Sequence, residues 1–359
     1  MSPAIQAELV NGPFGDPALI LDFAFERRAL LFDIGDVTAL ATRRLLRVSD
    51  VFVSHAHMDH FAGFDRMLRV RLGRDAGVAL WGPPGFTDRV EAKLGAYTWN
   101  VIGSYATEFV VTVHEVGLDW SLRTARFSSR SAFVREPLGE CSLPEAELHR
   151  TPGYTVRAAF LDHRTPCLAY CLVEAEHINV WKPKLEALGL PTGPWLTQLR
   201  RAIRDDAPNS TPIRVRWRDR DGAGEREFTV GELAREIIEL TPGQRIAYAT
   251  DAAMTAENAA RIAALARDAD LLFIEAAFLE ADRDHALRKA HMTAAFAGRV
   301  AAAACARRSV PFHFSTRYLG EGERLVAEFE AARAAASGWQ APSGALSSSA
   351  SETDDRTDA

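Results

Sequence analysis

Short apolar runs separated by turn residues open the chain and return in its last third. "ALILDFAF", "RALLFDIGD" and "VSDVFVSHAH" lie between residues 18 and 57, with Gly, Pro or Asp where they join. "RIAYATD", "ADLLFIEAA" and "SVPFHFS" follow after residue 244. Apolar runs of about four to eight residues bounded by turn residues are typical of strands. We therefore predict strands in both parts of the chain, and more of them in the strand-like runs of residues 105–171.

Segments with helical spacing separate these strands. They are "VTALATRRLL", "MDHFAGFDRMLRVRLG", "FTDRVEAKLGAYTW", "GELAREIIEL", "ENAARIAALARD" and "MTAAFAGRVAAAACARR". The alternation of strands and helices predicts an α/β chain. Residues 183–239 differ in character, with pieces rich in Pro, Gly and Arg. Residues 337–359 are rich in Ser, Gly and Asp with little apolar content, so we expect a disordered tail there.

Composition narrows the class of protein. The chain has 359 residues, 47% of them hydrophobic, and a net charge of −6. This charge argues against nucleic-acid binding through global charge, although it allows a local basic patch. Four cysteines in a chain of this length do not make a disulfide framework. We find neither an apolar run of about 20 residues nor a basic start followed by an apolar stretch, and we expect a cytoplasmic protein without membrane segments.

The stretch "HAHMDH", from His55 to His60, concentrates ligand-type side chains at a strand end. Imidazole and carboxylate groups suit zinc and similar divalent ions. His55 and His57 lie two apart, so on extended backbone they project to the same side. Asp59 and His60 fall where the chain turns toward a helix, so one motif can supply ligands to two ions. The alternative, a chance cluster of surface polar residues, is disfavoured by four ligand-type residues in six positions.

"HAHMDH" after "DVFVS" and "LLFDIGD" resembles the metallo-β-lactamase superfamily of binuclear metal hydrolases. Further along, "LDHRTPCLAYCLVE", "RIAYATDA" and "PFHFSTRY" resemble the segments that carry its remaining ligands. "FIEAAF" and "KAHMTAAFAG" resemble a pair of motifs typical of the tRNase Z (ribonuclease Z) branch. The resemblance runs in order from Ala18 to Tyr318.

The resemblance implies a fold and a domain plan. The fold is an α/β sandwich of the αββα type, in which two packed mixed β-sheets are flanked by helices. It would occupy residues 1–336, with an inserted arm at about 176–228 and the tail at 337–359.

The resemblance also implies two divalent metal ions, zinc being the first choice and manganese the alternative. The first ion would be held by His55, His57, His163 and Asp251. The second would be held by Asp59, His60, Asp251 and His313.

Three residues are implied to be catalytic, namely Asp59, Glu275 and His291. His291 would donate a proton to the leaving oxygen or bind the scissile phosphate, and Glu275 would set its tautomer and basicity. Without the family pattern, His291 stands at a predicted helix start and would more often be a cap or surface residue. Asp33 ends a strand aimed at the same face, where it would either orient a ligand histidine or serve as a plain turn carboxylate.

"KPKLEALGLPTGPWLTQLRRAI" resembles the protruding arm with which tRNase Z enzymes grip tRNA. The adjoining residues 196–220 hold seven arginines against three aspartates. Trp217 stands among those arginines, which suits phosphate and stacking contacts with RNA. The alternative is a solvated charged hairpin with no partner.

The function implied is that of a metal-dependent phosphodiesterase, an endonuclease that processes the 3′ end of precursor tRNA. RNA would bind through the basic arm 196–220, and the family pattern suggests a homodimer. One alternative is a hydrolase of the same fold that acts on a small ester or cyclic nucleotide, and another is a metal- or RNA-binding protein without turnover. Three departures from the tRNase Z pattern bear on the substrate: no element for recognising the tRNA end near residues 11–25, Met58 in place of the usual glycine, and "ATDA" in place of glycine-aspartate-threonine.

Overall fold

A computed structural model describes residues 5–74, 77–144, 146–219 and 222–336 of the chain. It divides into two compact units, of which the first comprises residues 1–146, 158–171 and 246–359. The second unit comprises residues 147–157 and 172–245. The predicted disordered tail at 337–359 lies outside the described residues.

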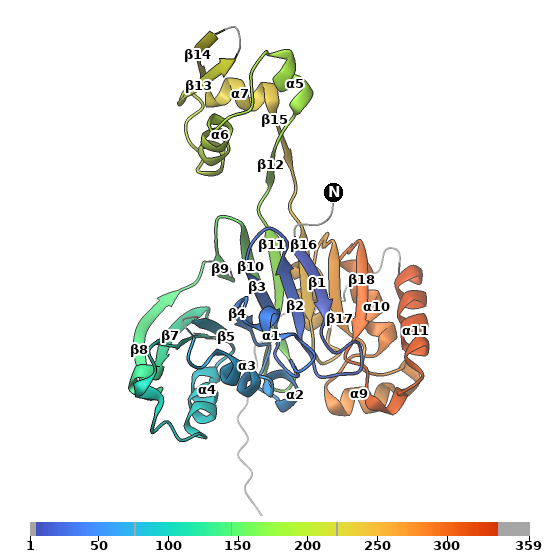
Figure 1. Ribbon diagram of the computed structural model, residues 1–359. Coiled ribbons are helices and arrows are strands. Elements are labelled where there is room, and N and C mark those ends of the chain that lie inside the picture. The colour runs from blue at the N-terminus through green and yellow to red at the C-terminus, as the bar shows by residue number, and fades with distance from the viewer. Residues whose placement is uncertain (1–4, 75–76, 145, 220–221, 337–359) are drawn as a thin grey trace, which may run out of the picture. The chain divides into compact units, whose positions relative to one another are not determined.

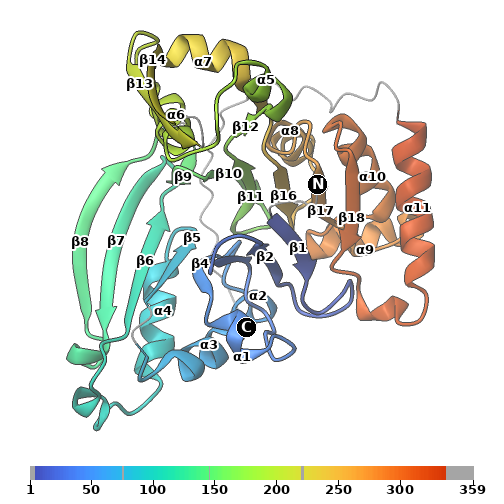
Figure 2. The same cartoon turned by 45° about the horizontal axis from the view of Figure 1, so that its top comes forward.

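The first sheet contains eight strands in chain order, antiparallel at both ends and parallel in the middle, from β3 to β6. These strands are β1 (Ile5–Leu9), β2 (Leu19–Phe23), β3 (Ala29–Phe32), β4 (Val48–Phe52), β5 (Val78–Gly82), β6 (Val110–Val116), β7 (Ser121–Ser128) and β8 (Arg135–Ser142). Helices α1 (Thr42–Leu45), α2 (Met58–Phe61), α3 (Phe64–Arg71) and α4 (Phe86–Gly95) belong to the same part of the chain. Figure 2 shows α4 beside the long strands β6 and β7.

The second sheet has six strands in the order β18-β17-β16-β11-β10-β9, with β16, β17 and β18 parallel. Its strands are β9 (Glu147–Arg150), β10 (Tyr154–Asp162), β11 (Pro166–Glu174), β16 (Arg245–Ala249), β17 (Leu271–Glu275) and β18 (Arg308–Phe312). Helices α8 (Ala256–Leu265), α9 (Arg283–Lys289), α10 (Ala294–Ala303) and α11 (Gly322–Ala335) accompany it, and Figure 1 shows α10 and α11 on the side of β18.

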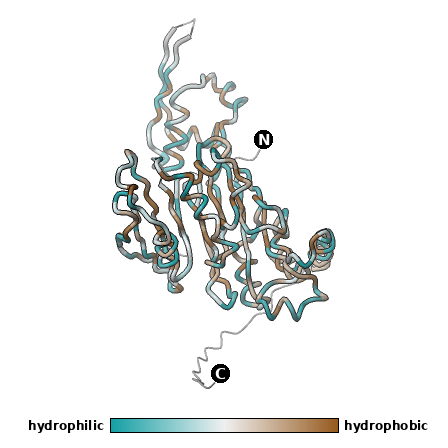
Figure 3. The backbone as a smooth tube through the Cα atoms, turned by 60° about the horizontal axis from the view of Figure 1, so that its bottom comes forward, coloured by the Kyte–Doolittle hydropathy of each residue, from teal (hydrophilic) through white to brown (hydrophobic). Residues whose placement is uncertain are grey.

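Aromatic side chains join the two sheets face to face. Phe32 of β3 stacks on Tyr170 of β11, with ring centroids 5.4 Å apart, and lies 5.8 Å from the ring of Tyr248 on β16. Phe52 of β4 meets Tyr170 edge-on at 5.6 Å. In Figure 3 hydrophobic segments recur along the central strands, as buried sheets require. Two mixed sheets with flanking helices confirm the predicted fold class.

The single helix predicted over residues 58–73 is wrong, because the chain breaks at Gly63. The backbone N–H of Gly63 donates to the carbonyl of Ile34 at 2.9 Å. A Cβ on Gly63 would lie 2.8 Å from the carbonyl oxygen of Gly35, so only glycine allows this approach. The break leaves α2 as one short turn that carries Asp59 and His60. The helix predicted over residues 37–46 is likewise reduced to α1.

The second unit has a small core of its own. It contains β12 (His177–Val180), α5 (Lys182–Ala187), α6 (Trp195–Arg204), β13 (Pro212–Asp219), β14 (Gly222–Thr229), α7 (Val230–Ile237) and β15 (Ile238–Thr241). The predicted helix "GELAREIIEL" therefore ends at Ile237, and its last residues form β15. The core gathers Trp195, Leu199, Val215, Leu233 and Ile237.

Trp217 lies on the core side of this unit rather than among the arginines. Along β13 the side chains alternate between faces, so Ile213, Val215 and Trp217 share one face and Arg214 and Arg216 the other. The indole of Trp217 packs over Gly224 on β14, where a Cβ would clash with it at 2.4 Å. Trp217 is therefore half-buried, with one side of its ring covered by the second strand of the hairpin.

Among the residues that the structure describes, no helix combines the length and the apolar composition that crossing a bilayer requires.

Candidate metal centre

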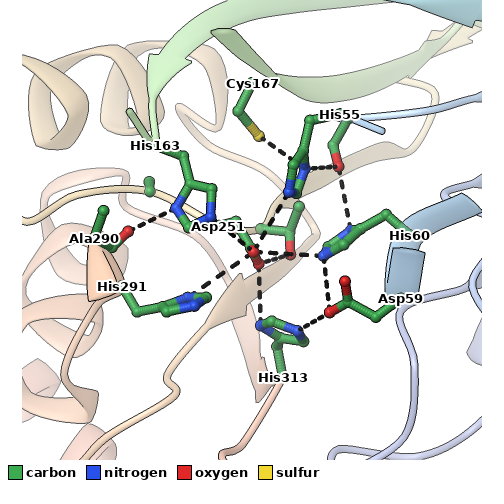
Figure 4. Close-up of polar contacts among 12 residues, drawn as sticks. His55, Asp59, His60, His163, Cys167, Asp251, Ala290, His291 and His313 are labelled. Atoms are coloured by element: carbon green, nitrogen blue, oxygen red, sulfur yellow. Dashed lines mark hydrogen bonds and ion pairs between the residues drawn. The ribbon is translucent and has the colours of Figure 1, made fainter. Parts of the chain in front are cut away.

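Four imidazoles surround the carboxylate of Asp251, which follows strand β16 and is buried (Figure 4). Its Oδ2 lies 3.7 Å from Nε2 of His55, 3.5 Å from Nε2 of His60 and 3.4 Å from Nε2 of His163. Its Oδ1 lies 3.0 Å from Nδ1 of His313. One carboxylate thus faces histidines that come from three distant parts of the chain.

The first group of ligand-type side chains comprises His55, His57, His163 and Asp251. One ligand atom from each lies within 4.8 Å of the others. The rings of His55 and His57 are 4.3 Å apart, as expected for residues two apart on extended backbone. His163 sits in the turn between β10 and β11 and donates from Nδ1 to the carbonyl of Ala290 at 2.8 Å, so its Nε2 faces the group.

The second group comprises Asp59, His60 and His313, again with ligand atoms within 4.8 Å of one another. Oδ2 of Asp59 lies 3.5 Å from Nε2 of His60 and 3.4 Å from Nε2 of His313. His313 follows β18, and Asp59 and His60 lie on α2. Asp251 is in reach of both groups, so the structure brings all seven predicted ligands together.

The residues present fit divalent cations. Three ring nitrogens are buried and have no hydrogen-bond partner within the described part of the chain: Nε2 of His55, Nε2 of His60 and Nδ1 of His313. Burying a polar atom without a partner is costly, and native proteins rarely do so. Each of these nitrogens faces a carboxylate of the same cluster at 3.0 to 3.7 Å. A cation among them would satisfy both the nitrogens and the carboxylates.

The electrostatics keep His55 and Asp251 in the form that binds a metal, whereas Asp251 and Asp33 outweigh the effect of burial on His60 and raise its pKa, so this imidazole must lose a proton when a cation binds. Burial, helped by the charge of His60, lowers the pKa of His55 to about 2, so this imidazole is neutral at any ordinary pH. Burial alone would raise the pKa of Asp251, but His313 and His60 outweigh it and hold the pKa well below its usual range. Neutral imidazole and ionised carboxylate are the forms that coordinate metals.

Asp33 holds His60 in place from behind. It directly follows β3, is fully buried, and has a positive φ of 56°. Its Oδ2 accepts from Nδ1 of His60 at 2.8 Å, from Oγ of Ser54 at 2.9 Å and from Oη of Tyr248 at 2.7 Å. These contacts leave Nε2 of His60 facing the cluster, so the structure favours the orienting role for Asp33 over the plain turn carboxylate.

Tyr248 is the residue that sequence reasoning missed. It lies on β16, three residues before Asp251, and is fully buried. A buried tyrosine needs a partner for its hydroxyl, and a polar group in the apolar run "RIAYA" was the available signal.

Glu275 and His291 form a second polar pair beside the cluster. Glu275 ends β17 and is fully buried, and its Oε1 makes a short contact with Nδ1 of His291. Burial alone would lower the pKa of His291, but Glu275 outweighs it and the pKa is raised. Nδ1 of His291 lies 4.0 Å from Oδ2 of Asp251. The cap of α10 is Thr293, so His291 does not serve as the helix cap.

Four other side chains near the cluster have contacts of their own. Oγ of Ser315 accepts from the N–H of Arg317 in a short turn. Arg317 itself pairs with Asp282 at 2.9 Å. Cys167 and Cys171 are buried thiols on β11, and Sγ of Cys167 approaches Nδ1 of His55 at 3.7 Å.

Comparisons with known proteins identify the family through sequence relatives. A sequence profile described as "Beta-lactamase superfamily domain" matches residues 206–314. Ribonuclease Z of Deinococcus radiodurans is 32% identical over 321 residues, which cover 88% of this chain and 91% of the relative. Ribonuclease Z of Haloferax volcanii is 29% identical over 306 residues, covering 83% and 78%. The crystal structure of the human short-form tRNase Z also matches. The match covers 88% of this chain and 92% of the human chain, with 19% sequence identity and a TM-score of 0.49.

Proposed function

Because this chain belongs to the ribonuclease Z branch of the metallo-β-lactamase superfamily, whose members are metal-dependent hydrolases, we propose that it removes 3′ trailers from precursor tRNA. The observation that carries this proposal is the joint placement of seven ligand-type side chains around Asp251 with the Glu275–His291 pair beside them. A binding protein without turnover would have no need for that additional acid–base pair.

In this proposal the two groups of side chains would hold two divalent ions. His55, His57 and His163 would hold one ion, Asp59, His60 and His313 would hold the other, and Asp251 is within reach of both groups. When bound, such ions lower the pKa of water toward about 7 and stabilise negative charge on phosphoryl oxygens. The chain's own contribution is to fix the ligands, and Asp33 does so for His60.

His291 is placed to handle the proton of the leaving oxygen. Its Nδ1 is engaged by Glu275, which leaves Nε2 for the substrate. The raised pKa keeps a larger fraction of the imidazole protonated near neutral pH, as a general acid requires. The side chain is 19% exposed, so it is in contact with the solvent-filled side of the site.

A second candidate, hydrolysis of a small phosphodiester or other ester, is favoured by the state of the arm. Arg214 pairs with Glu227 at 3.0 Å, and Arg216 pairs with Glu225 at 2.9 Å. The hairpin is therefore less basic than its arginine count suggests. Met58, 84% exposed at the start of α2, also adds an apolar side chain beside the ligand groups.

A direct assay separates the two candidates. The purified protein, loaded with zinc or with manganese, is given a 3′-extended precursor tRNA and, separately, an aryl phosphodiester. We expect cleavage of the precursor at the trailer junction. Cleavage of the aryl ester alone would favour the small-substrate candidate, and cleavage of neither by fully loaded protein would favour the binding protein. Sedimentation of the same sample tests the homodimer that the family pattern suggests.

A further inference from the structure

A pocket of about 330 Å³ lies in the first unit, beside the turn that carries His163. It is formed by the ends of β10 and β11, the turn after β6 and helix α8. Its lining includes Leu118, Phe160, Asp162, Arg164, Pro166 and Arg261. Its volume is at the lower end of the roughly 300–1,000 Å³ typical of pockets for small ligands.

Two lining residues are sequence neighbours of the proposed ligand His163, and the turn that carries them is held in place. Asp162 and Arg164 flank His163, whose Nε2 is 3.4 Å from Asp251. The side-chain amide of Asn258 on α8 binds the backbone of Asp162 in both directions, at 2.8 and 2.9 Å. The N–H of Arg164 donates to the carboxylate of Asp162 at 2.7 Å. The turn is therefore preformed, and a ligand in the pocket would contact the two residues that flank His163 in the sequence.

The walls of the pocket combine an apolar surface with hydrogen-bond donors and acceptors. Leu118 is 64% exposed, and Phe160 is buried and packs against the ring of Trp120, with centroids 5.1 Å apart. Arg261 donates to the carbonyl of Phe160 at 2.8 Å and to Glu257 at 2.5 Å. A guanidinium has five N–H groups, so these contacts leave donors for a ligand.

This combination matches a nucleotide. Apolar and aromatic walls accept the face of a base, guanidinium groups bind phosphate or base acceptors, and a carboxylate such as Asp162 accepts from a base amino group. A recess that takes one base suits unpaired RNA, whose bases can be turned out. In a precursor tRNA the trailer supplies such a segment next to the scissile bond.

We propose that this pocket binds one unpaired nucleotide of the 3′ trailer, with its base against Leu118 and its phosphate on Arg164 and Arg261. The inference rests on the proposed function. It adds a contact to the segment that is removed, separate from the arm in the second unit.

The test uses two RNA probes that the enzyme cannot cut at the junction, a fluorescein-labelled trailer oligonucleotide and mature tRNA. Leu118→Asp and Arg261→Gln should each weaken binding of the trailer about tenfold, the effect of losing one stacked base or one phosphate contact. Binding of mature tRNA should not change. Arg164 is left unaltered because it adjoins His163. Leu138→Asp and Arg307→Gln make the same changes at exposed positions outside the pocket and should alter neither affinity.

Thermal unfolding of each variant establishes that it is folded, and the exposed position of Leu118 makes its variant the safer of the two. An equal loss of affinity for both RNA probes, or no loss of affinity for the trailer, would contradict the proposed role of the pocket. Cleavage of the 3′-extended precursor by the unaltered enzyme is measured in parallel. If the precursor is cut but the trailer binds all variants equally, only the pocket is wrong; if the precursor is not cut, the tRNA assignment itself is wrong.

Discussion

Charged side chains gather in two regions of this molecule, the metal centre and the β13–β14 hairpin, and the two regions treat charge in opposite ways. In the metal centre His55, His60 and Asp251 are buried, and three ring nitrogens have no hydrogen-bond partner among the described residues. In the hairpin Arg214 and Arg216 are exposed and lie opposite glutamates. Burying unsatisfied polar atoms is costly, whereas exposed ion pairs change stability little. The buried cluster is therefore suited to hold cations from outside the chain, whereas the charges of the hairpin are matched within the chain.

The largest effect should come from Asp251→Ala, which removes the carboxylate that both ligand groups share. We expect turnover to fall below detection and bound metal to fall below two ions per chain, because each group loses a ligand. Metal content by mass spectrometry and the aryl phosphodiester assay measure the two effects.

The matched control is Asp284→Ala, which removes an exposed aspartate from α9. It should keep both metal content and activity. An Asp251→Ala protein that stays folded and retains two ions would contradict the sharing of this carboxylate.

His291→Ala should have the next largest effect, on rate rather than on metal. Loss of a general acid typically lowers the rate by about 10²- to 10⁴-fold. The metal content should stay at the level of the unaltered enzyme, because the seven proposed ligands remain. A metal loss equal to that of Asp251→Ala would show that His291 is a ligand instead.

A smaller effect should separate two buried tyrosines. Tyr248 donates to Asp33 at 2.7 Å, and Tyr170 donates to the backbone carbonyl of Val53 at 2.6 Å. Tyr248→Phe should weaken metal binding about tenfold, because it loosens the carboxylate that orients His60. Tyr170→Phe should cost about 1 kcal/mol of stability and leave metal affinity unchanged. Metal titration measures the metal affinity of both variants. Equal affinities would contradict the proposed role of Tyr248 in orienting His60 through Asp33.

The sequence predicted the metal centre better than it predicted the arm, for physical reasons. Four ligand-type residues lie within "HAHMDH", and the others follow strands whose ends meet at one edge, so local patterns were informative. Gly63 breaks the predicted helix through a contact with Ile34, and Tyr248 reaches Asp33 across the sandwich. Such contacts between distant segments leave no mark on local periodicity.

The arm shows the same limit in terms of charge. The seven arginines of residues 196–220 indicated a basic surface, but Glu225 and Glu227 lie just beyond that window and come opposite Arg216 and Arg214 once the hairpin forms. Likewise Trp217 is adjacent in sequence to Arg216 but on the other face of the strand. The charges that lie opposite the side chains of a strand depend on the strand with which it pairs, and the local sequence does not give that pairing.

The smallest effect should come from the ion pair between Arg216 and Glu225, whose side chains are 68% and 48% exposed. Arg216→Glu places two negative charges opposite each other and should lower stability slightly. Adding Glu225→Arg should restore it, with a coupling of about 0.2–1 kcal/mol measured by a double-mutant cycle in urea.

The same proteins test the arm as an RNA surface. If the main role of Arg216 is the ion pair with Glu225, the double variant should bind tRNA with the same affinity as the unaltered chain. If Arg216 contacts a phosphate, Arg216→Ala should reduce the slope of log affinity against log salt concentration by about 1. That result would show that the arm binds RNA through its charge.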